Sequence, residues 1–130
     1  MTAMRFRNPL ILLLLPCGVL AHHSMAAVFD FSQRISVTGT LTSVDWRNPH
    51  IYIYVDAAGD EGETESWAFE GPSPVVFRNL QDAGKEDFES AIGASIVVDA
   101  SRARDGSMSG LIRTIAFPDG RRITLCPNNC

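Results

Sequence analysis

The sequence predicts a mainly β protein: a small OB-like barrel of about five to six strands, with one short helix between strands three and four. Short runs of alternating apolar and polar residues, rich in β-branched and aromatic types, recur along residues 35–125. Turns that contain glycine or proline separate these runs. Helical signals follow the third run, and this order of elements suits a small closed sheet.

The first strand is expected to be long enough to bend and to pair on both sides of such a sheet. Within residues 35–46 the apolar positions alternate with serine and threonine, as in a half-buried strand. The phase of this alternation changes near residues 42–44, which predicts a β-bulge or a bend. The next two strands are expected at residues 50–55 and 64–70, after a turn at 47–49 and an acidic loop at 56–62.

A short helix is expected after the third strand. Ser73 is a suitable N-cap with Pro74 at the first helical position, and residues 75–80 continue an amphipathic pattern that ends near Gly84. Residues 85–92 are compatible with a helix or with a charged loop. The remaining strands are expected at residues 94–100, 111–117 and 121–125. A β-sandwich with an inserted helix is the alternative arrangement of the same elements.

The N-terminal segment has the features of a secretory signal peptide. Arg5 and Arg7 precede an almost wholly apolar run at residues 9–20, and the small residue Ala21 ends this run. The run is shorter than the roughly 20 apolar residues that a membrane-spanning helix needs. We therefore expect residues 1–21 to be removed, and we expect the mature protein to be periplasmic or secreted and to have no membrane span.

The mature chain, about 110 residues, is sufficient for one domain with one core. We divide it into an N-terminal arm at residues 22–34, the barrel at residues 35–125 and a cysteine-containing tail at residues 126–130. The full chain has a formal net charge of −4 at pH 7, and loss of the signal-peptide arginines makes the mature protein more acidic. An acidic surface repels phosphate backbones, so nucleic acid is not an expected partner.

A set of short motifs extends over the mature chain. They are residues 22–24 (HHS), 45–50 (DWRNPH), 67–71 (WAFEG), 103–107 (ARDGS) and 118–121 (PDGR). With these motifs the chain resembles DUF6152, a family of small exported bacterial proteins of unknown function. The resemblance implies export and a single small β-rich domain, and it supplies no activity. The chain departs from the family pattern after the helix and in its cysteine-containing tail.

The chain has three histidines, and all of them lie in two of these motifs. Cleavage after Ala21 gives His22 a free α-amine, so the amine and the ring of His22 can chelate one metal ion. His50 can supply a third nitrogen if the arm folds back over the barrel, an arrangement called a histidine brace. Cleavage after Leu20 would instead place His23 in third position, where the terminus also binds Cu(II).

We therefore predict a metal site formed by His22, His23 and His50, with copper as the cofactor, because nitrogen ligands in a tetragonal arrangement favour Cu(II). Asp45 and Glu70 are candidates to accept a hydrogen bond from the His50 ring and so to fix its orientation. The competing interpretation is a solvated arm and a turn histidine that bind no metal.

The alternative function is a metal-free module that binds a small ligand or a partner protein on an aromatic face of the barrel. Trp46, Asn48 and Trp67 are the candidates for that face. Alternating aromatic residues more often mark the buried face of a strand, so we favour a core position for the tryptophans.

Removal of the signal peptide, which contains Cys17, leaves two cysteines, Cys126 and Cys130. They are expected to form a disulfide in an oxidising compartment. No Ser/His/Asp set, glycine-rich phosphate loop or haem-attachment motif occurs, so we predict no catalytic residues and do not expect an enzyme. An oxidative copper enzyme is the more distant alternative.

Overall fold

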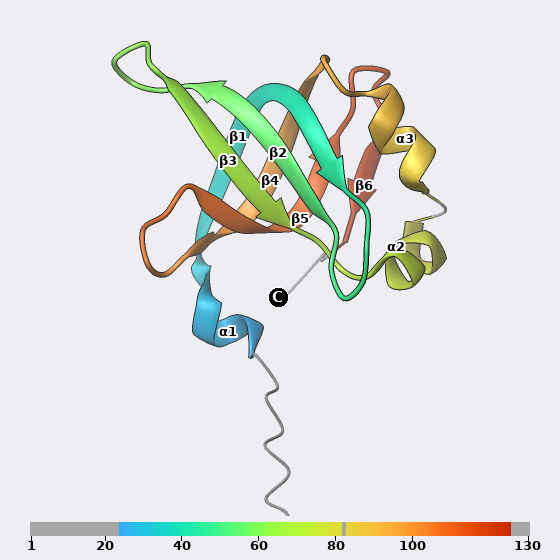
Figure 1. Ribbon diagram of the computed structural model, residues 1–130. Helices are drawn as coiled ribbons and strands as arrows, with labels where there is room; N and C mark the ends of the chain where they lie inside the picture. Colours follow the sequence, from blue (N-terminus) through green and yellow to red (C-terminus); the bar gives the residue numbers. More distant parts are fainter. Residues whose placement is uncertain (1–23, 82, 126–130) are drawn as a thin grey trace, which may run out of the picture.

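Six strands and three short helices make up the computed structural model, which describes residues 24–81 and 83–125 (Figure 1). In chain order they are α1 (Met25–Val28), β1 (Phe29–Asp45), β2 (Tyr52–Ala58), β3 (Thr64–Glu70), α2 (Pro74–Gln81), α3 (Lys85–Ser90), β4 (Ser95–Ala103), β5 (Ser109–Ala116) and β6 (Arg122–Thr124). The prediction of a mainly β protein is confirmed. No helix in the described ranges is both long and apolar enough to cross a membrane.

Strands β1 to β5 form a hydrogen-bonded ring, and β6 pairs with β5 beside it. The order of the strands is β3-β2-β1-β4-β5-β6, and an additional pairing between β3 and β5 closes the ring. This additional pairing is parallel and matches residues 68–70 to residues 109–111, whereas the other pairings are antiparallel. A closed ring with a helical connection between β3 and β4 agrees with the predicted OB-like arrangement rather than with a sandwich.

The long first strand pairs with β4 along most of its length and with β2 near its end. The predicted irregularity is present as a register shift between Leu41 and Ser43. The strand begins at Phe29, however, so residues 29–34 belong to the sheet and not to the predicted arm. A second register shift, between Asp30 and Arg34, breaks the alternation there and explains why the sequence has no clear period.

The connection between β3 and β4 contains two helices, α2 and α3, and not the single helix that we predicted. Residues 85–92, for which the pattern left two interpretations, form α3 and the turn that follows it. The carboxylate of Asp87 accepts a hydrogen bond from the backbone N–H of Gly84 (2.8 Å) and so caps the first turn of α3. Both helices insert a fully buried aromatic ring, from Phe77 and Phe88, into the core.

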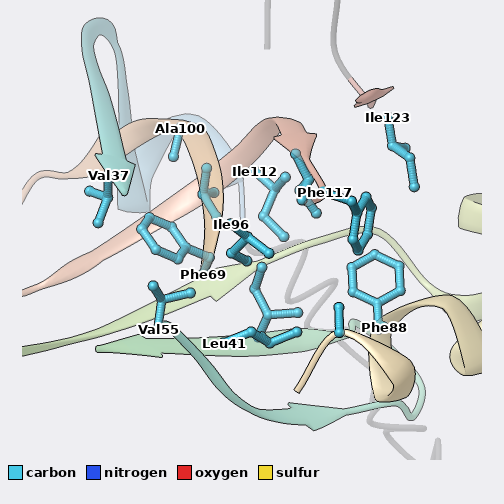
Figure 2. Close-up of a cluster of buried hydrophobic side chains, with 14 of the residues drawn as sticks. Val37, Leu41, Val55, Phe69, Phe88, Ile96, Ala100, Ile112, Phe117 and Ile123 are labelled. Carbon is cyan, nitrogen blue, oxygen red and sulfur yellow. The ribbon is translucent and has the colours of Figure 1, made fainter. Parts of the chain in front are cut away.

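The core fills the interior of the ring and continues beneath α2 and α3 (Figure 2). Alternate residues of the strands, such as Leu41, Val55 and Phe69, point inward and are fully buried. Below the helices, the Phe88 ring lies 5.1–5.3 Å from three other aromatic rings, measured between centroids. These neighbours are Trp46, Phe77 and Phe117.

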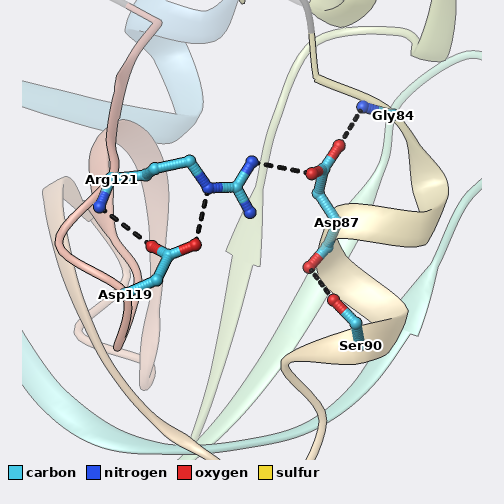
Figure 3. A network of polar contacts seen from close by, with 5 residues as sticks. All are labelled: Gly84, Asp87, Ser90, Asp119 and Arg121. Atoms are coloured by element: carbon cyan, nitrogen blue, oxygen red, sulfur yellow. Dashed lines mark hydrogen bonds and ion pairs between the residues drawn. The ribbon is translucent and has the colours of Figure 1, made fainter.

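A polar network attaches α3 to the hairpin between β5 and β6 (Figure 3). The guanidinium of Arg121 donates to Asp87 Oδ1 and to Asp119 Oδ2, both at 2.7 Å. The hydrogen bond from the Gly84 backbone, followed by the Arg121 guanidinium, holds the pKa of Asp87 below its usual value. The network therefore holds α3 over the aromatic part of the core.

Asp99 on the outer face of β4 connects three other strands. Its carboxylate accepts hydrogen bonds from Ser36 of β1 (2.7 Å), Thr114 of β5 (2.6 Å) and Arg122 of β6 (3.0 Å). Burial by itself would raise the pKa of Asp99, but these three donors outweigh it and lower the pKa below the usual value.

Asp99→Asn is expected to reduce the free energy of unfolding by about 1 kcal/mol at pH 7, because charge-assisted hydrogen bonds are lost at a partly exposed site. A lowered pKa in the folded state stabilises the protein above the unfolded-state pKa of about 3.9, and this contribution disappears as the pH falls through the folded-state pKa. Urea unfolding at several pH values should show the variant and the parent converging in acid. Asp60→Asn, in the turn after β2, is the control, and a difference that does not change with pH would contradict the prediction.

Candidate functional site

The connection between β1 and β2, residues 46–51, is held at both ends by the core. At its start the Trp46 ring packs against Phe77 and Phe88, with centroid distances of 5.4 and 5.3 Å. At its end Ile51 is fully buried. In Figure 1 this connection descends from β1 to the lower end of the sheet, beside α2.

The backbone around Ile51 is fixed by the chain that follows β3. The Ile51 N–H donates to the carbonyl of Pro72 (3.1 Å), and the Gly71 N–H donates to the carbonyl of Ile51 (2.9 Å). A side chain at Gly71 would approach Ile51 Cγ1 to 2.8 Å, so the close contact depends on glycine. These contacts hold His50, the residue before Ile51, beside the end of β3.

His50 makes its polar contact with Glu70, the last residue of β3. The His50 Nδ1 atom lies 2.5 Å from Glu70 Oε1. The glutamate side chain is only 13% exposed, whereas the histidine side chain is 37% exposed. Because a carboxylate can only accept a hydrogen bond, Nδ1 carries the proton, and in the neutral ring Nε2 keeps its lone pair.

Tyr52 holds the other side of the same carboxylate. Tyr52 and Glu70 are direct partners in the register of β2 and β3, and the phenol donates to Glu70 Oε2 (2.9 Å). Burial, together with the hydrogen bond to Glu70, raises the pKa of Tyr52 to about 12. The phenol therefore stays protonated at neutral pH and remains a donor that fixes the carboxylate.

Of the two acidic residues that the sequence suggested beside His50, Glu70 is the one in contact with its ring. Asp45, the other candidate for that role, pairs with the guanidinium of Arg47 (2.5 Å) and faces Tyr52 across the β1–β2 ladder. The sequence did not lead us to expect that Tyr52 holds the Glu70 carboxylate. The signal for it was its position two residues after His50, because side chains two apart in a strand share a face.

The predicted metal ligands are only partly within the described chain. His22 and His23 lie outside the described residues, and so do Cys126 and Cys130. Within residues 24–81 and 83–125, no three histidine, cysteine, aspartate or glutamate side chains are grouped in a way that would hold a metal ion. His50 is the predicted ligand that the structure describes.

The candidates for an exposed aromatic face do not form one. Trp67 is 5% exposed, its Nε1 donates to Glu65 Oε2 (3.0 Å), and the guanidinium of Arg102 covers its ring at 5.2 Å. Trp46 belongs to the aromatic part of the core, and Asn48 is exposed, with a cis peptide bond to Pro49. Trp67 is buried on the inward side of β3, as the strand pattern favoured, whereas Trp46 follows the end of β1 and is only partly buried against the core.

The first described residues lie on the outer face of the sheet, near the end of β3. Met25 of α1 packs against a small cluster formed by Phe29, Ala103 and Leu111, which is separate from the main core. Leu111 is the direct partner of Glu70 in the parallel ladder, and paired residues of neighbouring strands project from the same face. The segment that leads into the sheet therefore approaches the Glu70 side of the site.

The fold and the site define a small, mainly β protein that presents a partly exposed histidine, oriented by a mostly buried carboxylate, in the loop between its first two strands. The chain belongs to DUF6152, a family of unknown function, whose model matches residues 11–113. This match confirms the family that the motifs indicated. A sequence search of curated proteins found no match, so the chemistry has to be inferred from the residues.

Proposed function

We propose that this protein is an exported copper-binding protein whose site combines the mature N-terminus with His50. The ligands would be the α-amine and ring of His22 together with His50 Nε2, and His23 is the alternative if cleavage occurs one residue earlier. The observation that carries the proposal is the contact between His50 Nδ1 and Glu70 Oε1. Histidines that bind metals commonly donate their second ring nitrogen to a carboxylate in this way.

The position of α1 supports the participation of the N-terminus. Met25 packs in the cluster that contains Leu111, the strand neighbour of Glu70. Neighbouring strands lie roughly 4.8 Å apart, and three extended residues span roughly 10 Å. The proposal therefore requires the residues before Met25 to extend toward the His50 side of the sheet.

Export is a necessary part of this proposal. The basic, apolar and small-residue segments of residues 1–21 are those of a cleavable signal peptide. Cleavage after Ala21 would create the amine that completes the ligand set, so an uncleaved chain or an N-terminal tag would remove the site. The expected compartment is the periplasm or the exterior of the cell.

The test is a Cu(II) titration of the mature chain, after mass spectrometry has identified its first residue. We expect one Cu(II) per chain, bound with a Kd below about 1 μM, which corresponds to about 8 kcal/mol. Electron paramagnetic resonance should show coupling to nitrogen ligands. The matched control is the same chain with an acetylated N-terminus, whose affinity should be at least about 100-fold lower because a direct ligand is lost.

Three results would count against the proposal. The first is a Kd in the micromolar range or weaker, and the second is an affinity that acetylation leaves unchanged. The third is a mature terminus that begins after His23, because it would lack the predicted ligands. Each would favour the metal-free binding module instead.

A further inference from the structure

A hollow of about 350 Å³ lies on the outer face of the sheet, where four strands meet. It is large enough for a small ligand, since ligand pockets begin at about 300 Å³. Its polar lining consists of Arg34 and Ser36 from β1, Asp99 from β4, Arg113 and Thr114 from β5, and Thr124 from β6. None of these residues belongs to the His50 site.

Two irregularities in strand pairing bring the arginines to this hollow. The register of β1 against β4 shifts directly before Arg34. In β5, Ile112 and Thr114 pair with consecutive residues of β4, so Arg113 is the extra residue of a β-bulge. A bulge redirects the side chain it carries and is often found near functional sites. The backbone carbonyl of Arg113 accepts the N–H of Leu125 (2.8 Å), which fixes the bulge.

The charges in the hollow favour an anion. Arg113 is only 5% exposed, and its burial, followed by the nearby positive charge of Arg34, lowers its pKa. Arg34 is exposed, and its guanidinium forms no hydrogen bond or ion pair within residues 24–81 and 83–125. Arg113, in contrast, also interacts with other groups of the protein. Asp99 is the carboxylate of the lining, and its oxygens already accept hydrogen bonds from side chains of three neighbouring strands.

We propose that this hollow binds a small oxyanion, a carboxylate or a phosphate, beside the guanidiniums of Arg34 and Arg113. The guanidinium of Arg34 offers the planar, charge-assisted hydrogen bonds that oxyanions accept, and the positive charge of Arg113 adds electrostatic attraction. The two arginines make this site locally positive, although the formal net charge of the chain is −4. It is independent of the copper site, because it uses neither the N-terminus nor His50.

The test is a titration of the metal-free mature chain with inorganic phosphate and, separately, with acetate, at constant ionic strength. Binding is followed by the arginine side-chain resonances in NMR spectra. We expect saturation in the low millimolar range for at least one of the two anions. Arg34→Gln should weaken the binding by about 10-fold, because charge-assisted hydrogen bonds are lost, and Arg34→Lys should retain part of it.

Arg47→Gln is the matched control, since Arg47 is an exposed arginine of the β1–β2 connection that pairs with Asp45. It should leave the affinity unchanged, as should His50→Ala. The comparison of the two anions decides between phosphate and carboxylate as the ligand. Absence of saturation for both anions up to roughly 50 mM, or equal weakening by Arg47→Gln and Arg34→Gln, would overturn the proposal.

Discussion

Phe88→Ala is expected to lower the free energy of unfolding by about 3–5 kcal/mol, the usual cost of removing a buried phenyl ring. Phe88 is fully buried, and its ring contacts those of Trp46, Phe77 and Phe117. Since α3 is short, this ring is its main attachment to the core. A domain of this size is stabilised by roughly 5–15 kcal/mol in total, so the variant should be close to unfolding at physiological temperature.

Chemical denaturation of the mature chain measures this effect. Phe88→Leu is the first control, and we expect a loss of less than about 1.5 kcal/mol because most of the volume is kept. Val75→Ala is the second control, because Val75 on α2 is 50% exposed and should cost less than about 0.5 kcal/mol. A loss of under 1 kcal/mol for Phe88→Ala would show that α3 does not pack as described.

His50→Ala is expected to reduce the affinity for Cu(II) by at least about 100-fold, because a direct nitrogen ligand is removed. Glu70→Gln should cost about 10–100-fold, the usual range for loss of the group that orients a metal-binding histidine. The glutamine can present its amide N–H to Nδ1, which favours the wrong tautomer of the ring. Tyr52→Phe removes only the support of the carboxylate and should have a smaller effect of the same sign.

Asp45→Asn is the matched control for Glu70→Gln. Asp45 lies across the β1–β2 ladder from Tyr52 and pairs with Arg47, not with His50. It should leave the affinity for Cu(II) unchanged. Equal losses in Asp45→Asn and Glu70→Gln would indicate a general effect of negative charge.

A measurement without metal distinguishes the effect of Glu70 on the orientation of the His50 ring from the effect of its negative charge. In nitrogen-15 NMR spectra of the metal-free chain, neutral His50 should carry its proton on Nδ1, and Glu70→Gln should shift the tautomer population toward Nε2. An unchanged tautomer in this variant would contradict the orienting role of Glu70, whatever the copper affinity shows.

Local pattern in the sequence was sufficient for most of the secondary structure. The strand predicted at residues 64–70 is β3 (Thr64–Glu70), because one of its faces is buried and its side chains alternate without interruption. The start of β1 at Phe29 was missed, because a register shift interrupts the alternation. The second helix, α3, was left undecided, because its six residues carry too few apolar positions for a clear helical period.

For the candidate site, too, the sequence pattern was sufficient for only part of the prediction. The motifs identified His50 and two acidic residues, but the spacing along the chain did not decide between Asp45 and Glu70. That decision depends on the register of β2 and β3, which pairs Tyr52 with Glu70, and on the hydrogen bonds that hold Ile51 beside Gly71. Register is a property of two strands together, so one strand's sequence does not contain it.

The sequence by itself thus determined the mainly β class, the approximate strands, the family and the histidine of the β1–β2 connection. Each of these follows from near neighbours along the chain, where alternation and turn residues act. The tertiary structure decided which carboxylate contacts His50, and it decided that two irregularities in strand pairing bring Arg34 and Arg113 to one hollow. These features depend on contacts between segments distant in the chain, which form only when the strands pair in one register and close into a ring.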